Sequence, residues 1–250
     1  MNAEWILETR ALRKAFAGFF AVSGVDLKVA RGTIHALIGP NGAGKTTVFN
    51  LVTRFLPVTS GTILFRGDDI TDAAAAQVAR RGMVRSFQVS ATFPNLTALE
   101  NVRVALQRKL GTSFHFWRSE RTLERLDGRA AELLAEVGLE EHRATLTAEL
   151  PYGRKRALEL ATTLALDPEV MLLDEPTQGM GHEDVGRVVA LIQRVAKGRT
   201  VLMVEHNLSV VQDLADRVTV LARGQVLAEG TYGEVSKDPA VLEAYIGAPA

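Results

Sequence analysis

The sequence predicts an α/β fold with a mostly parallel β-sheet, a small antiparallel β subdomain and an inserted helical subdomain. Short runs rich in β-branched residues alternate with stretches of helical periodicity, which is typical of a parallel sheet flanked by helices. Several of these runs end directly on glycine or charged residues, as strands do where they lead into a binding site. Between residues 94 and 166 the pattern becomes helical instead.

The first elements along the chain are strand-like pieces joined by turns. They occupy residues 6–12, 25–29 and 61–66. Short turns join antiparallel strands, whereas parallel strands need a long crossover connection. We therefore expect a small antiparallel sheet beside the main sheet.

The main sheet is predicted from three buried, apolar strands. They occupy residues 33–38, 170–173 and 200–204, and each is followed by a glycine or by charged or polar residues of the kinds that bind ligands or catalyse reactions. The first leads into Gly39, the second into Asp174 and Glu175, and the third into Glu205 and His206. Ligands of open α/β sheets bind beyond the carboxyl ends of the strands, so the three ends are expected to meet at one site.

Three amphipathic helices are predicted in the middle of the chain. Apolar residues recur at spacings of three and four over residues 99–110, 123–137 and 155–166. We expect a single domain over residues 1–250. Its core would consist of residues 1–88 and 167–250, and its helical subdomain of residues 89–166.

Composition excludes several classes of protein. The chain has 250 residues, no cysteine and a formal net charge of zero. Disulfides, thiolate metal sites and cysteine nucleophiles are thereby ruled out, and a basic field for nucleic acid is not visible. No apolar run approaches the roughly 20 residues that cross a bilayer, and the N-terminus lacks the pattern of a secretion signal. At a membrane, the chain is expected to act as a soluble subunit.

The turn after the first buried strand carries the pattern G-x-x-x-x-G-K-[ST], which binds phosphates. Its residues are Gly39, Pro40, Asn41, Gly42, Ala43, Gly44, Lys45, Thr46 and Thr47. The glycines let successive N–H groups point at phosphate oxygens, and the next helix adds its positive N-terminal end. Lys45 would contact the β- and γ-phosphates, while the Thr46 hydroxyl would bind Mg²⁺. A turn that binds nothing would leave the lysine and threonine without a purpose, so ATP and Mg²⁺ are the expected cofactors.

Two adjacent carboxylates complete the expected metal and water site. Asp174 follows an apolar strand and can hold Mg²⁺ through water, and Glu175 is placed to polarise an attacking water. Alone, an acidic strand end that caps a helix explains this pair equally well. Together with the loop, the pair predicts ATP hydrolysis.

Over essentially its whole length, the chain resembles the ATP-binding subunit of an ABC transporter, a P-loop NTPase. Residues 39–47 match the Walker A loop and residues 170–174 the Walker B strand. The resemblance implies that Glu175, His206 and Lys45 are catalytic. It further implies that Gln88 senses the γ-phosphate or Mg²⁺ and that Phe16 stacks on adenine.

The family's signature segment, usually Leu-Ser-Gly-Gly-Gln, is altered here to Leu150, Pro151, Tyr152, Gly153 and Arg154. In family members this segment crosses a dimer and closes the partner's ATP site. Pro151 suits a first helical turn but lacks the serine hydroxyl and a backbone donor. Gly181 stands where the family usually has aspartate. The resemblance leaves open whether the two ATP sites of a dimer are equal.

Residues 84–88, residues 93–102 and the ending at 239–247 resemble the branched-chain (hydrophobic) amino acid importer ATPases, in the longer of their two types. This resemblance implies transmembrane permeases and a second ATP-binding subunit as partners, and a solute-binding protein as an indirect one. The permeases would dock near residues 89–99. The chain would lie peripherally on the cytoplasmic face of the inner membrane.

Other classes of nucleotide-binding protein share part of this sequence pattern. An ATPase of lipopolysaccharide export shares much of the pattern, and a soluble ABC ATPase acting on DNA or ribosomes is a second candidate. A small GTPase or kinase would leave residues 150–154 without a purpose, and a guanine-reading Asn-Lys-x-Asp is absent. The aromatic residues at 111–117 would pack a loop onto its own domain or touch a membrane or partner.

Overall fold

The computed structural model describes residues 5–86, 92–108 and 125–246. These residues form two compact units. The first, called the core unit here, comprises the described parts of residues 1–85, 169–177 and 196–250. The second, the helical unit, comprises the described parts of residues 86–168 and 178–195.

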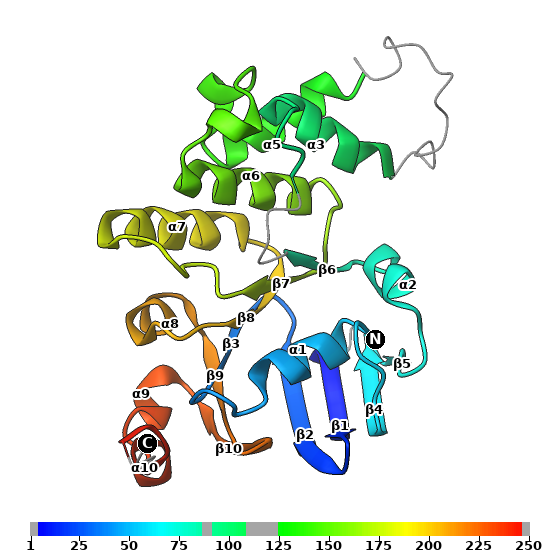
Figure 1. Ribbon diagram of the computed structural model, residues 1–250, viewed down its shortest axis with the longest axis vertical. Helices are drawn as coiled ribbons and strands as arrows, with labels where there is room; N and C mark the ends of the chain where they lie inside the picture. Colours follow the sequence, from blue (N-terminus) through cyan, green and yellow to red (C-terminus); the bar gives the residue numbers. More distant parts are fainter. Residues whose placement is uncertain (1–4, 87–91, 109–124, 247–250) are drawn as a thin grey trace. The chain divides into compact units, whose positions relative to one another are not determined.

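The N-terminal strands of the core unit form the predicted antiparallel sheet. It has four strands in the order β2-β1-β4-β5, drawn in blue to cyan in Figure 1. Their bounds are β1 Trp5–Phe16, β2 Phe19–Ala30, β4 Ser60–Phe65 and β5 Asp68–Asp69. A tight turn at Ala17 and Gly18, both with positive φ, joins β1 to β2. This part of the predicted fold is confirmed.

The larger sheet has six strands in the order β10-β9-β3-β8-β7-β6. The pairs β3–β8, β3–β9 and β7–β8 are parallel, and the edge strand β10 is antiparallel to β9. The bounds are β3 Ile34–Ile38, β6 Met83–Ser86, β7 Val170–Asp174, β8 Thr200–Val204, β9 Arg217–Ala222 and β10 Gln225–Gly230. The mostly parallel sheet is therefore confirmed, with three strands added to those predicted.

Helix α1, which follows the predicted loop, is held by one apolar cluster that joins the two sheets. Phe49 of α1 packs there with Leu27 of β2, Phe65 of β4 and Leu172 of β7, all fully buried. Full burial of one such side chain stabilises the fold by about 1.5–3 kcal/mol relative to leaving it exposed to water. The start of α1 is thereby fixed relative to the carboxyl ends of β3 and β7. The helices of the core unit are α1 Lys45–Val52, α2 Ala75–Arg80, α8 Leu208–Leu214, α9 Tyr232–Val235 and α10 Pro239–Ile246.

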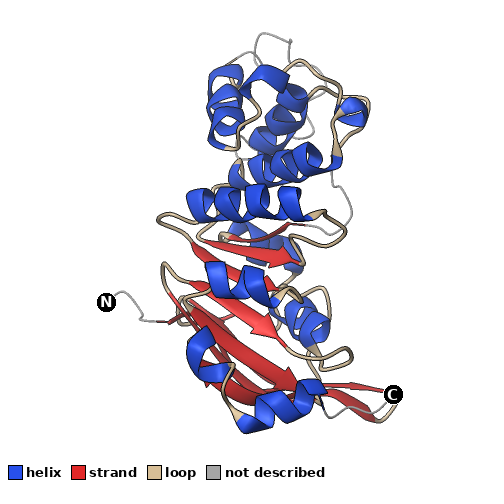
Figure 2. Cartoon of the chain, turned by 90° about the vertical axis from the view of Figure 1, so that its left-hand side faces the viewer, coloured by secondary structure: helices blue, strands red, loops and turns tan. Residues whose placement is uncertain are grey.

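The helical unit consists of helices joined by loops, as Figure 2 shows in blue and tan. Its α-helices are α3 Ala98–Gln107, α5 Asp127–Glu136, α6 Tyr152–Leu164 and α7 His182–Val195. Helix α3 packs on α5 and α6, and α6 packs on α7. The first three overlap the predicted helices at 99–110, 123–137 and 155–166. Helix α5 begins only at Asp127 and α6 ends already at Leu164, and residues 109–110 and 123–124 lie outside the described residues. Within the described part of the chain, no helix has the length and apolar character needed to span a bilayer.

Candidate active site

The loop between β3 and α1 adopts a conformation that only glycine tolerates at two points. Gly39 has φ 147°, and a Cβ there would lie 2.1 Å from the Leu221 carbonyl oxygen of β9. Gly44 has φ 101°, and a Cβ there would lie 2.6 Å from the Ala21 carbonyl oxygen. A side chain at either point would displace the backbone of a neighbouring strand, so the curled loop depends on both glycines.

Lys45, the first residue of α1, lies folded back over this loop. Its Nζ donates to the carbonyl oxygens of Gly39 at 2.7 Å and Pro40 at 2.9 Å. Burial lowers the pKa of Lys45, and the negative charge of Glu175 opposes that effect. The ammonium group therefore spans the curled loop at the N-terminal end of a helix, where anions bind most readily.

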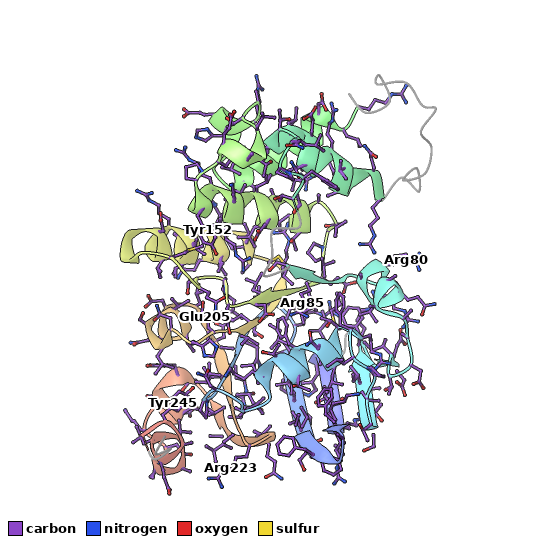
Figure 3. All side chains as sticks on the ribbon, in the orientation of Figure 1. Arg80, Arg85, Tyr152, Glu205, Arg223 and Tyr245 are labelled. Carbon is purple, nitrogen blue, oxygen red and sulfur yellow. The ribbon has the colours of Figure 1, made fainter. Side chains whose placement is uncertain are left out.

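Two contacts from the C-terminal part of the core unit brace the same loop. Gly224, in the turn between β9 and β10, donates its N–H to the Ala43 carbonyl at 2.9 Å and accepts from the Ser23 N–H at 2.8 Å. Tyr245 of α10 makes a hydrogen bond with the backbone of Gly39. Figure 3 labels Tyr245 and Arg223, the residue preceding Gly224 in the turn. The loop is thus held from strands and a helix distant in sequence.

The end of β7 places Asp174 in a buried ion pair. Its side chain is 2% exposed, and its Oδ2 accepts from the Arg85 guanidinium at 2.5 Å. A second nitrogen of Arg85 donates to Oδ1 of Asn50 in α1, also at 2.5 Å. The sequence did not indicate that Arg85 pairs with Asp174, because Arg85 lies on β6, a strand that the residue pattern did not predict.

Glu175 follows Asp174 in a backbone conformation that is rare for a residue with a side chain. Its φ is 44°, and its N–H donates to the Val204 carbonyl at the end of β8. Its Oε1 lies 2.6 Å from Nε2 of His206. Non-glycine residues in this region are strained and concentrate at functional sites. The structure therefore brings together two residues that the sequence selected from different strand ends.

Glu205, at the end of β8, ties these strand ends together. Its buried carboxylate accepts from the N–H and hydroxyl of Thr177 through Oε1. Through Oε2 it accepts from the N–H groups of His206 and Asn207. Figure 3 labels Glu205. The sequence marked Glu205 as the end of a strand but gave no role to its side chain, which shapes the backbone on both sides of the Glu175–His206 pair.

The side chains present are suited to Mg²⁺ bound together with a phosphate ligand. The expected donors are oxygens, the exposed Thr46 hydroxyl and the Asp174 carboxylate, and hard oxygen ligands are those that Mg²⁺ prefers. Among the described residues, no group of three or more His, Cys, Asp or Glu side chains could hold a metal ion. A metal at this site would therefore need ligands from a bound nucleotide or from water.

Comparisons with known proteins agree with this geometry. The sequence profile described as ABC transporter matches residues 22–178. The chain is 38% identical to the high-affinity branched-chain amino acid transport ATP-binding protein BraF of Pseudomonas aeruginosa, over 97% of this chain and 98% of BraF. It is 37% identical to the high-affinity branched-chain amino acid transport ATP-binding protein LivG of Escherichia coli, over 97% of this chain and 98% of LivG.

The chain belongs to the ABC transporter family. The ADP conformation of MJ1267, an ATP-binding cassette of an ABC transporter, superposes on it with a TM-score of 0.85 at 31% identity, covering 97% of this chain and 99% of that one. A nucleotide-free ATP-binding cassette from an ABC transporter gives a TM-score of 0.82 at 29% identity, with the same coverage. A second profile, described as branched-chain amino acid ATP-binding cassette transporter, matches residues 225–250. The predicted family and fold are confirmed, and the chain is an ABC transporter ATPase.

In this ABC ATPase the altered signature segment forms the start of α6 in the helical unit. The helix begins at Tyr152, earlier than the predicted start at residue 155, because Pro151 takes the N-cap position with φ −58°. Leu150 is buried, whereas the Tyr152 ring is 59% exposed and its hydroxyl donates to the Gln178 carbonyl at 3.2 Å. Gly153 lies near Asp184 of α7. Proline is accommodated without breaking the helix.

Of two further residues expected at the nucleotide site, Phe16 and Gln88, the structure describes only Phe16. Phe16 ends β1 with its ring 45% exposed, and the Lys14 ammonium lies 5.2 Å from the ring centroid. An exposed aromatic face at the end of a hairpin is available for stacking. Gln88 and the aromatic residues at 111–117 lie outside the described residues.

Proposed function

We propose that this ABC ATPase powers a membrane importer of branched-chain or other hydrophobic amino acids. The observation that carries this proposal is the near full-length match to relatives named as branched-chain amino acid transport ATP-binding proteins. The C-terminal match at residues 225–250 supports the same assignment independently of the nucleotide-binding residues. An ATPase of another membrane system, such as lipopolysaccharide export, is the second candidate.

Binding of ATP would use the curled loop and its neighbours. The backbone of residues 39–47 surrounds the phosphates, Lys45 leaves its carbonyl partners to contact the β- and γ-phosphates, and Phe16 stacks on adenine. Thr46, Gln88 and Asp174 would hold Mg²⁺. When bound, Mg²⁺ offsets the charge of the phosphates and orients them for in-line attack.

Hydrolysis would use the pair formed by Glu175 and His206. The Glu175 carboxylate is fixed by its strained backbone and by the His206 ring, so it can orient a water molecule toward the γ-phosphate. The fixed geometry reduces the reorganisation needed when the phosphate is attacked.

Two such chains, or this chain and a related one, would enclose two ATP molecules. Residues 150–153 of one subunit would cover the nucleotide of the other, with the N-terminus of α6 directed at its γ-phosphate. Permease subunits would dock near residues 89–99, and a solute-binding protein would act through them. The chain would then lie on the cytoplasmic face of the inner membrane as a peripheral subunit, without a nucleic-acid partner.

Isolation of the complex tests this function. The tagged chain is purified from membranes in mild detergent, its partners are identified, and the complex is reconstituted in liposomes. ATP-dependent uptake of leucine, isoleucine or valine is expected with the wild-type chain and is expected to vanish with Lys45→Ala. Co-purification with lipopolysaccharide export components, or uptake of a polar solute alone, would contradict the proposed solute class.

A further inference from the structure

The proposed mechanism gives no role to Arg85 of the core unit. Arg85 lies on β6, and its guanidinium joins Asp174 at the end of β7 to Asn50 in α1. Arg85 is itself mostly buried, with 13% of its side chain exposed. The carboxylate proposed to hold Mg²⁺ is therefore already paired with a cation of the protein.

The guanidinium of Arg85 is held firmly in place. Its Cζ lies 5.2 Å from the ring centroid of Phe49 and 5.7 Å from that of Phe55. Cation–π contacts of this kind and the bond to Asn50 hold the group from several sides. Arg85 is thus a fixed positive charge against Asp174, because its planar group is bonded at both ends.

This fixed charge alters how a divalent cation meets Asp174. A buried carboxylate without a partner is costly, so it strongly favours a nearby cation. Arg85 supplies that cation within the protein, and its positive charge also repels a metal ion approaching the same carboxylate. Since the described residues contain no cluster of three or more His, Cys, Asp or Glu side chains that could hold a metal ion, the metal needs the negative charge of the nucleotide phosphates to bind.

We propose that Arg85 is a positioning residue that makes binding of a divalent cation at Asp174 conditional on bound nucleotide. The proposal rests on the role proposed above for Asp174. In the nucleotide-free protein, Arg85 neutralises and orients the carboxylate. When ATP brings its phosphates, their charge outweighs that of the guanidinium and the metal binds.

The test measures metal binding without nucleotide, using Mn²⁺ as a spectroscopic substitute for Mg²⁺. Mn²⁺ is titrated at pH 8 into the full-length wild type, Arg85→Met and Arg85→Gln, and free Mn²⁺ is followed by electron paramagnetic resonance. We expect one site in the variants that binds at least tenfold more tightly than any site in the wild type. Adding Asp174→Asn to Arg85→Met is expected to abolish it. A merely structural role for Arg85 would not create a metal site.

Arg103 provides a matched control. Its guanidinium is also mostly buried and pairs with Asp127 at 3.1 Å, and its Nε, like that of Arg85, is buried without a hydrogen-bond partner in the protein. Arg103→Met is expected to keep the Mn²⁺ affinity of the wild type. An equal gain in this variant would overturn the proposal, because any lost arginine would then suffice.

Asn50→Ala keeps the test decisive if both variants at position 85 fail to fold. This substitution removes one anchor of Arg85 and leaves its charge, so a smaller gain in Mn²⁺ affinity is expected. The proposal is overturned if folded Arg85 variants have the Mn²⁺ affinity of the wild type. If the Arg85 variants are insoluble, it is overturned by an Asn50→Ala variant whose Mn²⁺ affinity equals that of the wild type. A gained site that survives Asp174→Asn would also overturn it. None of these outcomes depends on which solute is transported, so they leave the proposed import function to its own test.

Discussion

The imidazole Nε2 of His206 lies 2.6 Å from Oε1 of Glu175, and this contact joins the second residue after β8 to the residue directly after β7. The Glu175 side chain is 12% exposed and the His206 side chain 43% exposed. The pair therefore has one protected member and one that faces solvent. This asymmetry is consistent with the proposed roles, in which the Glu175 carboxylate orients a water molecule and His206 holds that carboxylate in place.

Glu175→Gln is expected to reduce ATP turnover at least a hundredfold and to leave ATP binding intact. The amide keeps the size of the side chain but cannot accept a proton from water, and loss of general-base assistance costs about 10²–10⁴-fold. Steady-state ATPase assays and nucleotide titrations measure the two effects separately. Size-exclusion chromatography with ATP is expected to show a trapped dimer. Turnover near that of the wild type would remove the assignment of Glu175.

Lys45→Ala is expected to weaken binding of ATP itself by tenfold or more. A charged hydrogen bond contributes about 1.5–3 kcal/mol, and Lys45 is the cation that lies across the phosphate loop. Titration with a fluorescent ATP analogue measures the affinity. Lys237→Ala, which removes an exposed lysine after α9, serves as the control and is expected to bind as the wild type does. An unchanged affinity in Lys45→Ala would count against the assigned loop.

Glu205→Gln is expected to lower both stability and turnover. The carboxylate accepts four hydrogen bonds from Thr177, His206 and Asn207, and an amide group presents donors toward some of these N–H and O–H groups. An unsatisfied buried donor costs about 1–3 kcal/mol. Urea unfolding measures the free energy of unfolding, with Glu229→Gln in the surface pair with Arg217 as the control. Equal stability of both variants would contradict the bridging role of Glu205.

Buried His35 predicts a loss of stability in mild acid. Burial, with a smaller effect of the Arg217 charge, lowers the pKa of His35 to about 4. The unfolded chain binds a proton near the ordinary pKa of about 6.5, so the stabilisation is complete above that pH and is lost as the pH falls toward 4. The loss from this group amounts to about 2 kcal/mol at pH 5.

Replacement of His35 by Gln tests this dependence. The side chain can still bond the Thr219 hydroxyl, which lies 2.8 Å from Nε2 of His35, but it does not titrate. Urea unfolding at pH 7.5 and pH 5 is expected to show a smaller decrease in the free energy of unfolding for His35→Gln than for the wild type. Parallel decreases would show that other groups cause the acid sensitivity.

Features formed by residues close together in the chain could be predicted from the sequence. The loop from Gly39 to Thr47 is recognised from spacing alone, because its glycines and lysine act within one turn. The pair Arg85–Asp174 could not be found this way, since its members are 89 positions apart and meet only through the packing of β6 beside β7. The bridge from Glu205 to Thr177 spans 28 positions and depends equally on neighbouring strand ends. Pairings across a sheet leave no periodic trace along the chain.

The contact between Gly224 and Ala43 has a consequence for the order in which the protein acquires activity during its synthesis. The phosphate loop is encoded early in the chain, but the turn that braces it is translated much later. Domains of growing chains fold only when their parts are present. A growing chain therefore lacks this brace of the phosphate loop until the β9–β10 hairpin has been synthesised.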